Sequence, residues 1–245
     1  MNATDSANGA APSQPNRTRE FLAWTVHLLT ASGAVWGLLA IFALMRDEFG
    51  LATIFMIVAL GIDSIDGSFA RKLEVSKYAP GIDGRRMDDI VDYLNFVIVP
   101  CVFMVTAGSV LSPYWVTLPA LASAFGFSQN DAKTDDHFFL GWPSYWNILA
   151  LYLWLLEITP LYGTLCVIFF SIAIFIPYKY IYPSRLKNRT LRYFVSYSGL
   201  IWALVIVWAV LDPSSTSRFS LVEISLLYPA LYMGLSFKLG GLHRS

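Results

Sequence analysis

The sequence has little charge, little histidine and almost no cysteine. Only 14% of its 245 residues are charged, and it contains three histidines and two cysteines. With 56% hydrophobic residues, the chain has more apolar surface than a soluble domain can bury. Two cysteines exclude a disulfide-rich framework, and because Cys101 and Cys166 both lie in apolar stretches, we expect small buried residues and no disulfide. The net charge is zero, and no nucleic acid partner is expected.

Long apolar stretches are abundant instead. Several contain about twenty residues, which is enough for a helix to cross a hydrocarbon layer of roughly 30 Å. They lack the strict alternation of a barrel strand, so helices are favoured. We predict an all-α integral membrane protein with about eight transmembrane helices, at residues 22–45, 50–71, 87–108, 113–130, 143–158, 160–182, 191–211 and 219–240.

The chain is expected to form one membrane domain over residues 21–245, after a disordered cytoplasmic tail at residues 1–20 that is rich in small and polar residues. If the N-terminus is cytoplasmic, eight helices leave only Arg46 and Arg218 outside among the 17 lysines and arginines. This asymmetry follows the positive-inside rule, so we predict that both termini are cytoplasmic.

Four aspartates stand at the predicted cytoplasmic ends of two consecutive helices. Asp63 and Asp66 are three residues apart, and Asp88 and Asp92 are four apart, so each pair lies on one helix face. A short loop joins the two helices, and we expect the two faces to be neighbours. Four carboxylates at one level repel each other unless a cation offsets their charge. An all-oxygen site of this kind suits Mg²⁺ or Mn²⁺.

Small residues accompany these aspartates. Gly67 and Ala70 extend the first face and Gly84 extends the second, which lets a phosphorylated ligand approach the backbone closely. Arg71 and the basic loop after it provide positive charge for phosphate groups.

Solvated caps are the plainer interpretation of acidic residues near helix ends, and we prefer it for Glu74, Asp83 and Asp89. The four aspartates on the shared faces differ, because ionisable groups within apolar helices are costly and usually functional.

The residues match a known pattern. Asp63-x-x-Asp66-Gly67-x-x-Ala70-Arg71 followed by Gly84-x-x-x-Asp88-x-x-x-Asp92 resembles the signature of the CDP-alcohol phosphotransferase family. The gap from Lys72 to Asp83 holds twelve residues, which is longer than usual and resembles bacterial members that use choline. The stretch HLLTASGAVWG also resembles the family's Asn-x-Leu-Thr…Gly pattern, with His27 in place of Asn and with Thr30 and Gly37 matching.

The resemblance implies transfer of the phosphatidyl group from CDP-diacylglycerol to an alcohol, with release of CMP, at the cytoplasmic face of a bacterial inner membrane. It assigns Mn²⁺ or Mg²⁺ binding to Asp63, Asp66, Asp88 and Asp92, and it gives Asp92 the further role of general base. Contacts to the CDP-lipid are assigned to Gly67, Ala70, Arg71, Gly84, Thr30 and His27. A homodimer is common in the family.

The acceptor that the resemblance favours is choline, whose quaternary ammonium donates no ordinary hydrogen bond, so an aromatic cage is expected. Tyr145 and Trp146, at the predicted cytoplasmic start of the fifth helix, are the candidates. Most other aromatic residues at helix ends fit an interfacial belt.

Three alternatives stay open at this point. In the first alternative, the enzyme has the same chemistry but a different acceptor alcohol, such as inositol phosphate, glycerol phosphate, serine or ethanolamine. A phosphorylated acceptor needs an arginine cluster, which the loop KYIYPSRLKNR can supply. A membrane prenyltransferase also uses paired aspartates, although its two motifs usually lie far apart in sequence. A cation transporter is the third, because membrane carboxylates often mark ion pathways.

Overall fold

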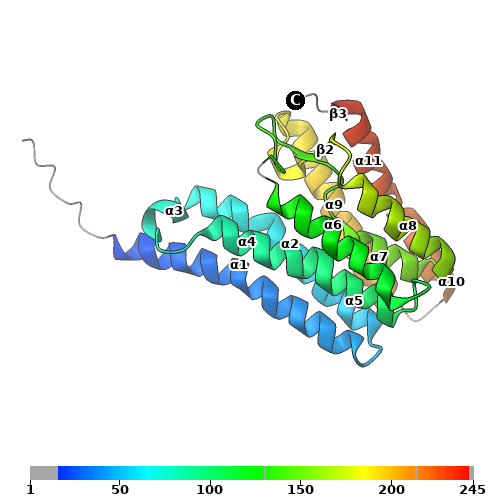
Figure 1. Ribbon diagram of the computed structural model, residues 1–245. Coiled ribbons are helices and arrows are strands. Elements are labelled where there is room, and N and C mark those ends of the chain that lie inside the picture. The colour runs from blue at the N-terminus through cyan, green and yellow to red at the C-terminus, as the bar shows by residue number, and fades with distance from the viewer. Residues whose placement is uncertain (1–15, 130, 213–214, 243–245) are drawn as a thin grey trace, which may run out of the picture.

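The computed structural model describes residues 16–129, 131–212 and 215–242, which are mainly helical (Figure 1). The helices are α1 (Arg17–Leu44), α2 (Phe49–Lys72), α3 (Val75–Tyr78), α4 (Gly84–Tyr93), α5 (Val99–Thr106), α6 (Thr117–Ser128), α7 (Trp146–Leu155), α8 (Pro160–Ala173), α9 (Arg189–Leu211), α10 (Ser215–Ser225) and α11 (Leu227–Leu239). A π-helical segment, η1 (Leu94–Ile98), joins α4 to α5, and two short 3₁₀ segments are η2 (Pro113–Val116) and η3 (Pro183–Arg185).

Five helical segments have the length and composition to cross a membrane, and the expectation of a helical membrane protein is confirmed. They are Arg17–Leu44, Phe49–Lys72, Gly84–Thr106, Arg189–Leu211 and Ser220–Leu239. The other three predicted spans correspond to α6, α7 and α8, which have 12, 10 and 14 residues. Helices of that length extend only about 15–21 Å, less than the hydrocarbon thickness.

The predicted span 160–182 is wrong at its C-terminal end, because α8 stops at Ala173 and the chain then forms strand β2 (Tyr178–Ile181). Pro177 explains the break, since a proline disfavours helical geometry in the residue before it. The tail predicted at residues 1–20 lies mostly outside the described residues, and α1 already begins at Arg17. Cys101 and Cys166 are both free, as expected.

Side-chain caps fix where three helices begin on the predicted cytoplasmic side. The side chain of Asn16 accepts a hydrogen bond from the Arg19 amide, Asp83 accepts one from the Arg86 amide, and Asn188 accepts one from the Leu191 amide. Each cap satisfies a backbone N–H that the first helical turn leaves unpaired. The cap role preferred for Asp83 is therefore confirmed, and it sets the first residue of the helix that carries Asp88 and Asp92.

Close packing joins α1 to the helix of the second aspartate pair. Gly33 and Gly37 on α1 face η1, and a Cβ at Gly37 would lie 2.5 Å from Oδ1 of Asn95. The Asn95 amide donates to the backbone oxygens of Gly33 (3.0 Å) and Val91 (3.1 Å). The π-helical turn ends at Ile98, two residues before Pro100, whose ring clashes with a regular α-helical carbonyl, so a widened turn accommodates it.

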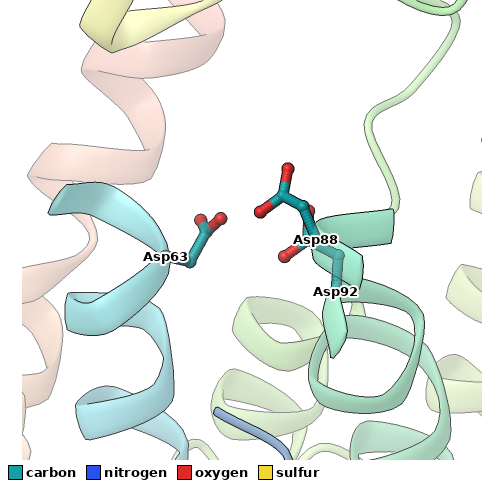
Figure 2. A group of neighbouring side chains, drawn as sticks. All are labelled: Asp63, Asp88 and Asp92. Atoms are coloured by element: carbon teal, nitrogen blue, oxygen red, sulfur yellow. The ribbon is translucent and has the colours of Figure 1, made fainter. Parts of the chain in front are cut away.

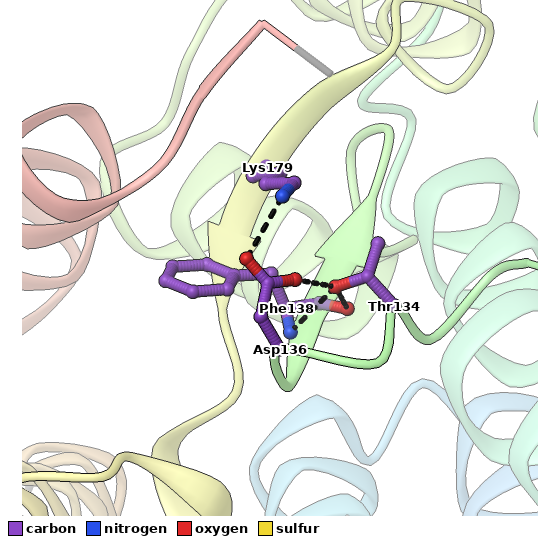
Figure 3. Close-up of polar contacts among 4 residues, drawn as sticks. All are labelled: Thr134, Asp136, Phe138 and Lys179. Carbon is purple, nitrogen blue, oxygen red and sulfur yellow. Dashed lines mark hydrogen bonds and ion pairs between the residues drawn. The ribbon is translucent and has the colours of Figure 1, made fainter. Parts of the chain in front are cut away.

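A small antiparallel sheet covers the end of the bundle near the aspartates. Its strand order is β1 (Phe138–Leu140), β2, β3 (Gly241–Leu242). Figure 3 shows the Asp136 carboxylate between Lys179 of β2, at 2.8 Å, and the Thr134 hydroxyl, at 2.6 Å. These contacts close the loop before β1 and lower the pKa of Asp136 to about 2, because the Lys179 and Thr134 side chains donate hydrogen bonds to its charged form.

Candidate active site

Three aspartates converge between α2 and α4. Asp63 projects from α2 towards Asp88 and Asp92, which lie one turn apart on α4 (Figure 2). One carboxylate oxygen from each residue lies within 4.8 Å of the others, and all three side chains are half-buried. The helix spacing that predicted two facing carboxylate pairs therefore brings these three together.

Asp66, the fourth aspartate, lies one turn along α2 and lines the same pocket. Its side chain is buried, and its Oδ2 accepts a hydrogen bond of 2.8 Å from the Thr30 hydroxyl of α1. Among the described residues, Asp66 is not part of the cluster whose carboxylate oxygens lie within 4.8 Å of one another. Thr30, predicted to contact the CDP-lipid, lines the same pocket and orients this acidic residue.

His27 lies on α1 one turn before Thr30, and its ring faces Gly84 at the start of α4. A Cβ at Gly84 would lie 3.0 Å from Cε1 of His27, so the absence of a side chain at position 84 allows α1 and α4 to approach closely. The His27 side chain is buried, and its Nε2 has no hydrogen-bond partner among the described residues. His27 and Gly84, which belong to two separate parts of the family pattern, are therefore in direct packing contact.

The remaining signature residues follow Asp66 on α2. Arg71 is exposed, and its Nη2 donates to the Ser68 hydroxyl at 3.1 Å. Gly67 lies beneath this guanidinium, since a Cβ there would lie 3.2 Å from Nη1 of Arg71. Ala70 packs instead against the small apolar cluster of α1 and α3. The structure therefore leaves Arg71 exposed at the end of α2 and places Ala70 in a helix contact.

Two basic residues of later loops also approach the site: Arg185 belongs to the loop KYIYPSRLKNR considered above, whereas the sequence pattern did not single out Lys133. Lys133 interacts electrostatically with Asp88 and Asp92, and Arg185 interacts with Arg71. Burial alone would lower the pKa of Lys133, but attraction to Tyr182, Asp88 and other acidic groups outweighs it and leaves the pKa above its ordinary value. Nε of Arg185 is buried and has no hydrogen-bond partner among the described residues.

Comparison with known proteins agrees with this geometry. The sequence model of the CDP-alcohol phosphatidyltransferase family matches residues 24–177, a range that contains all four aspartates. The chain belongs to this family. Family membership makes it an enzyme of phosphatidyl transfer and decides against the prenyltransferase and transporter alternatives.

Several curated relatives of the chain carry the name phosphatidylcholine synthase. The relative from Legionella pneumophila is 37% identical over 225 residues, covering 89% of this chain and 88% of its own. The relative from Borreliella burgdorferi is 34% identical and covers 88% and 92%, and the relative from Rhizobium meliloti is 30% identical and covers 87% and 88%. The similarity thus extends over most of the chain, including the part after residue 177.

A divalent metal fits the carboxylate cluster. Members of the family depend on such a metal, and the three converging oxygens of Asp63, Asp88 and Asp92 are hard donors suited to it. Among the described residues, no histidine or cysteine belongs to this group. The donor set therefore matches an oxygen-preferring ion better than zinc, which favours nitrogen and sulfur.

The two aromatic candidates differ in their environments. Trp146 has no exposed surface; its indole nitrogen donates to the Ser123 hydroxyl at 2.7 Å, and its ring packs on Trp142. It is a core residue, so the expectation that it faces a choline pocket does not agree with the structure. Tyr145 is only half-buried, and its hydroxyl interacts electrostatically with Asp63. Adjacent positions at the start of a helix point in different directions, which separates the two roles.

Proposed function

We propose that this protein transfers the phosphatidyl group of CDP-diacylglycerol to choline, producing phosphatidylcholine and CMP. The observation that carries the reaction type is the convergence of Asp63, Asp88 and Asp92 from two helices of a family member. The choice of choline is supported by the relatives named phosphatidylcholine synthase, which match most of the chain.

Asp92 is the proposed general base. Its carboxylate takes the proton of the choline hydroxyl as that oxygen attacks the phosphorus bonded to diacylglycerol. A new phosphorus–oxygen bond forms to choline, the bond to the CMP oxygen breaks, and CMP leaves with the bonding electron pair. Asp92 lies within the carboxylate cluster, so a hydroxyl held there has both a proton acceptor and an adjacent phosphorus in reach.

Asp63 and Asp88, with Asp92 beside them, are the residues proposed to hold the metal, and Asp66 is the proposed fourth member of the set. A bound Mg²⁺ or Mn²⁺ neutralises charge on the diphosphate and makes CMP a better leaving group. The Thr30 hydroxyl fixes the orientation of Asp66, and this support reduces the reorganisation needed when substrate binds.

Positive charge around the aspartates is proposed to hold the diphosphate. Lys133 approaches from the loop before β1, and Arg71 lies at the end of α2. Gly67 and Gly84 leave room for the Arg71 and His27 side chains beside the aspartates, and the buried His27 Nε2 has no hydrogen-bond partner among the described residues, so we propose it for a nucleotide contact. This arrangement suits a substrate with two phosphates because two cations from separate elements interact with the aspartates.

The position of the enzyme in the membrane is also a proposal. We infer eight crossings with both termini in the cytoplasm, in a bacterial inner membrane, from the distribution of lysine and arginine. The acyl chains of the substrate then stay in the lipid while its headgroup enters the cytoplasmic end of the bundle. A homodimer is proposed on the family resemblance alone.

A phosphorylated acceptor is the second candidate, and one observation favours it. Arg185, from the loop predicted to supply an arginine cluster, has a buried Nε without a partner and interacts electrostatically with Arg71. The same charge can instead serve the diphosphate of CDP-diacylglycerol, which every acceptor reaction needs.

The test is CMP release by the purified full chain with CDP-diacylglycerol and Mn²⁺ or Mg²⁺, with five acceptors offered separately: choline, serine, ethanolamine, inositol phosphate and glycerol phosphate. We expect release with choline alone and its loss on chelation. Release only with another alcohol would keep the aspartate mechanism and discard choline. No release with any acceptor, from protein that still binds CDP-diacylglycerol, would contradict the proposed reaction.

A further inference from the structure

Three tyrosines from two distant parts of the chain meet beside the aspartates. Tyr145 immediately precedes α7, and Tyr228 and Tyr232 lie four residues apart on α11, so the latter two share a helix face. The rings of Tyr145 and Tyr232 are 5.3 Å apart between centroids and stand at 75° to each other. Two nearly perpendicular rings form a corner, which is the geometry from which an aromatic cage is built.

The cluster is fixed in place from behind. The Tyr232 hydroxyl donates a hydrogen bond of 3.0 Å to the backbone oxygen of Ile181 in β2. Tyr228 packs on Trp202, and its hydroxyl fits against Gly199 of α9, where a Cβ would lie only 2.7 Å from it. Because β2 and α9 hold the two rings of α11, their faces are preorganised for a ligand.

Tyr145 connects the cluster to the carboxylates. Its hydroxyl interacts electrostatically with Asp63 of the catalytic cluster, and also with Tyr228 and Tyr232. Tyr145 and Tyr228 are only half-buried, whereas Tyr232, with 6% exposure, forms the inner wall. A ligand that meets Asp63 therefore has aromatic surface within reach on the α7 and α11 side.

Some aromatic rings among the described residues have a lysine or arginine side chain over one face. Within the part of the chain that the structure describes, lysine and arginine groups lie over the rings of Tyr78, Phe138 and Tyr193, and none lies over the three clustered tyrosines. Their electron-rich faces are thus available to a cation from outside, and the nearby Asp63 carboxylate adds negative potential.

We propose that Tyr145, Tyr228 and Tyr232 form the receptor for the quaternary ammonium of the acceptor, which rests on the proposed use of choline. Choline has only a two-carbon chain between its hydroxyl and its nitrogen. A receptor for the nitrogen must therefore lie near the carboxylates that meet the hydroxyl. Tyr145, whose ring packs against Tyr232, is close enough to Asp63 for the two groups to interact electrostatically.

The first test replaces single rings and compares the two substrates. Tyr145→Leu and Tyr228→Leu should each raise the choline KM by about tenfold, because a desolvated cation–ring contact contributes an interaction of that order. The KM for CDP-diacylglycerol should stay within about twofold on the same reasoning. Tyr145→Phe and Tyr228→Phe, which keep the rings, should restore the choline KM.

The matched control is Tyr178→Leu. Tyr178 lies on β2 at the same end of the molecule and packs on Tyr180 and Phe237, outside the three-tyrosine cluster. We expect its choline KM to remain that of the wild type. A neutral acceptor, 3,3-dimethylbutan-1-ol, has the shape of choline without its charge; the preference of the wild type for choline over this alcohol should fall in the two leucine variants and stay unchanged in the control.

A second measurement serves if the leucine variants do not fold. Phenylalanine with none, one, two or three ring fluorines is incorporated at position 145 or 228, which changes the electron density of the face with little change of shape. A cation–ring contact predicts a choline KM that rises steadily with the number of fluorines. A flat series at both positions, or an equal rise in the CDP-diacylglycerol KM, would overturn the cage. Absence of CMP release with choline in the wild type would instead contradict the proposed function.

Discussion

At the residue scale, Asp92 lies one helical turn after Asp88, and its carboxylate faces Asp63 across the site (Figure 2). Asp92→Asn keeps the shape of the side chain and removes its ability to accept a proton at neutral pH. We expect the rate of CMP release to fall by about 10²–10⁴-fold, the usual contribution of a general base. The variant should still bind CDP-diacylglycerol, measured as a rise in melting temperature when the lipid is added.

Asp135→Asn is the control for this substitution. Asp135 is an exposed carboxylate in the loop before β1, outside the three-aspartate cluster. Its loss of charge should leave CMP release unchanged. Full activity of Asp92→Asn would remove the base role from Asp92, and equal losses in the two variants would point to a general charge effect.

The sequence predicted the site residues that lie close together along the chain and missed those that come from distant elements. The aspartates lie on two consecutive helices, and spacings of three and four residues determine a helix face without knowledge of the fold. Lys133, Tyr228 and Tyr232 reach the same site only through the packing of distant elements, and neither their spacing nor their neighbours in sequence predicts it. Trp146 was misplaced because a helix start alone does not show which of two adjacent side chains enters the core.

At the element scale, the contact between α1 and η1 depends on residues without side chains. Gly37→Ala would put a methyl group 2.5 Å from Oδ1 of Asn95, which lies three residues after Asp92. Displacement of Asn95 should strain the helix that carries the base. We expect a loss of about 1–3 kcal/mol in the free energy of unfolding, as is typical of overpacking, and a lower rate of CMP release.

Gly61→Ala is the matched control, because a Cβ at Gly61 on α2 would meet no atom within 4 Å. Alanine in an open helical position is neutral or stabilises by about 0.5–1 kcal/mol. Chemical unfolding of the purified variants in detergent should therefore separate the two substitutions. The same loss of stability in both would show that the glycine contact with Asn95 is unimportant.

The ion pair between Asp136 and Lys179 joins the loop before β1 to β2 (Figure 3). The pKa of Asp136 is lowered to about 2, so its contribution to stability is present above the ordinary aspartate pKa of about 3.9 and is lost as the pH falls towards 2. Asp136→Asn should lower the melting temperature at pH 6, and its difference from the wild type should shrink as the pH approaches 3. Asp135→Asn should show no such trend, and a constant difference for Asp136→Asn would contradict the ion-pair role.

The element boundaries also show the limit of hydropathy. Apolar stretches predicted α1, α2 and α9 closely because each is one uninterrupted helix. The same signal merged α8 with β2, because tyrosines and isoleucine are apolar in either conformation. The turn before β2 depends on local contacts such as Gly141 at φ +79°, where a Cβ would clash with the Ile174 oxygen, and average hydropathy does not detect such a contact.

At the scale of the whole molecule, the connections divide between the two ends of the helices. The small sheet and α3 lie towards one end, and the turn between α1 and α2 lies towards the other (Figure 1). The helices α6, α7 and α8 are shorter than the hydrocarbon layer is thick. Seven of the ten residues of α7 are buried against other parts of the protein. Burial by neighbouring helices lets a short helix occupy membrane depth without lipid contact along its length.

Cysteine labelling tests the proposed eight crossings. In a Cys101→Ala, Cys166→Ala background, Lys77→Cys and Asp131→Cys should react with a membrane-impermeant maleimide only from the cytoplasmic side. Asp47→Cys and Ser112→Cys should react only from the opposite side. All four native residues are exposed or half-exposed, so reactivity reports their side of the membrane.

Position 131 carries the most information in this set, because α6 alone, with its 3₁₀ turn η2, separates it from position 112. Reaction of both positions from the same side would mean that this short segment does not cross, and the loop with Lys133 would then have to reach the aspartates from the other face. Reaction from opposite sides places Lys133, Arg71 and the carboxylates at one surface, where a soluble choline and a membrane-embedded CDP-diacylglycerol meet.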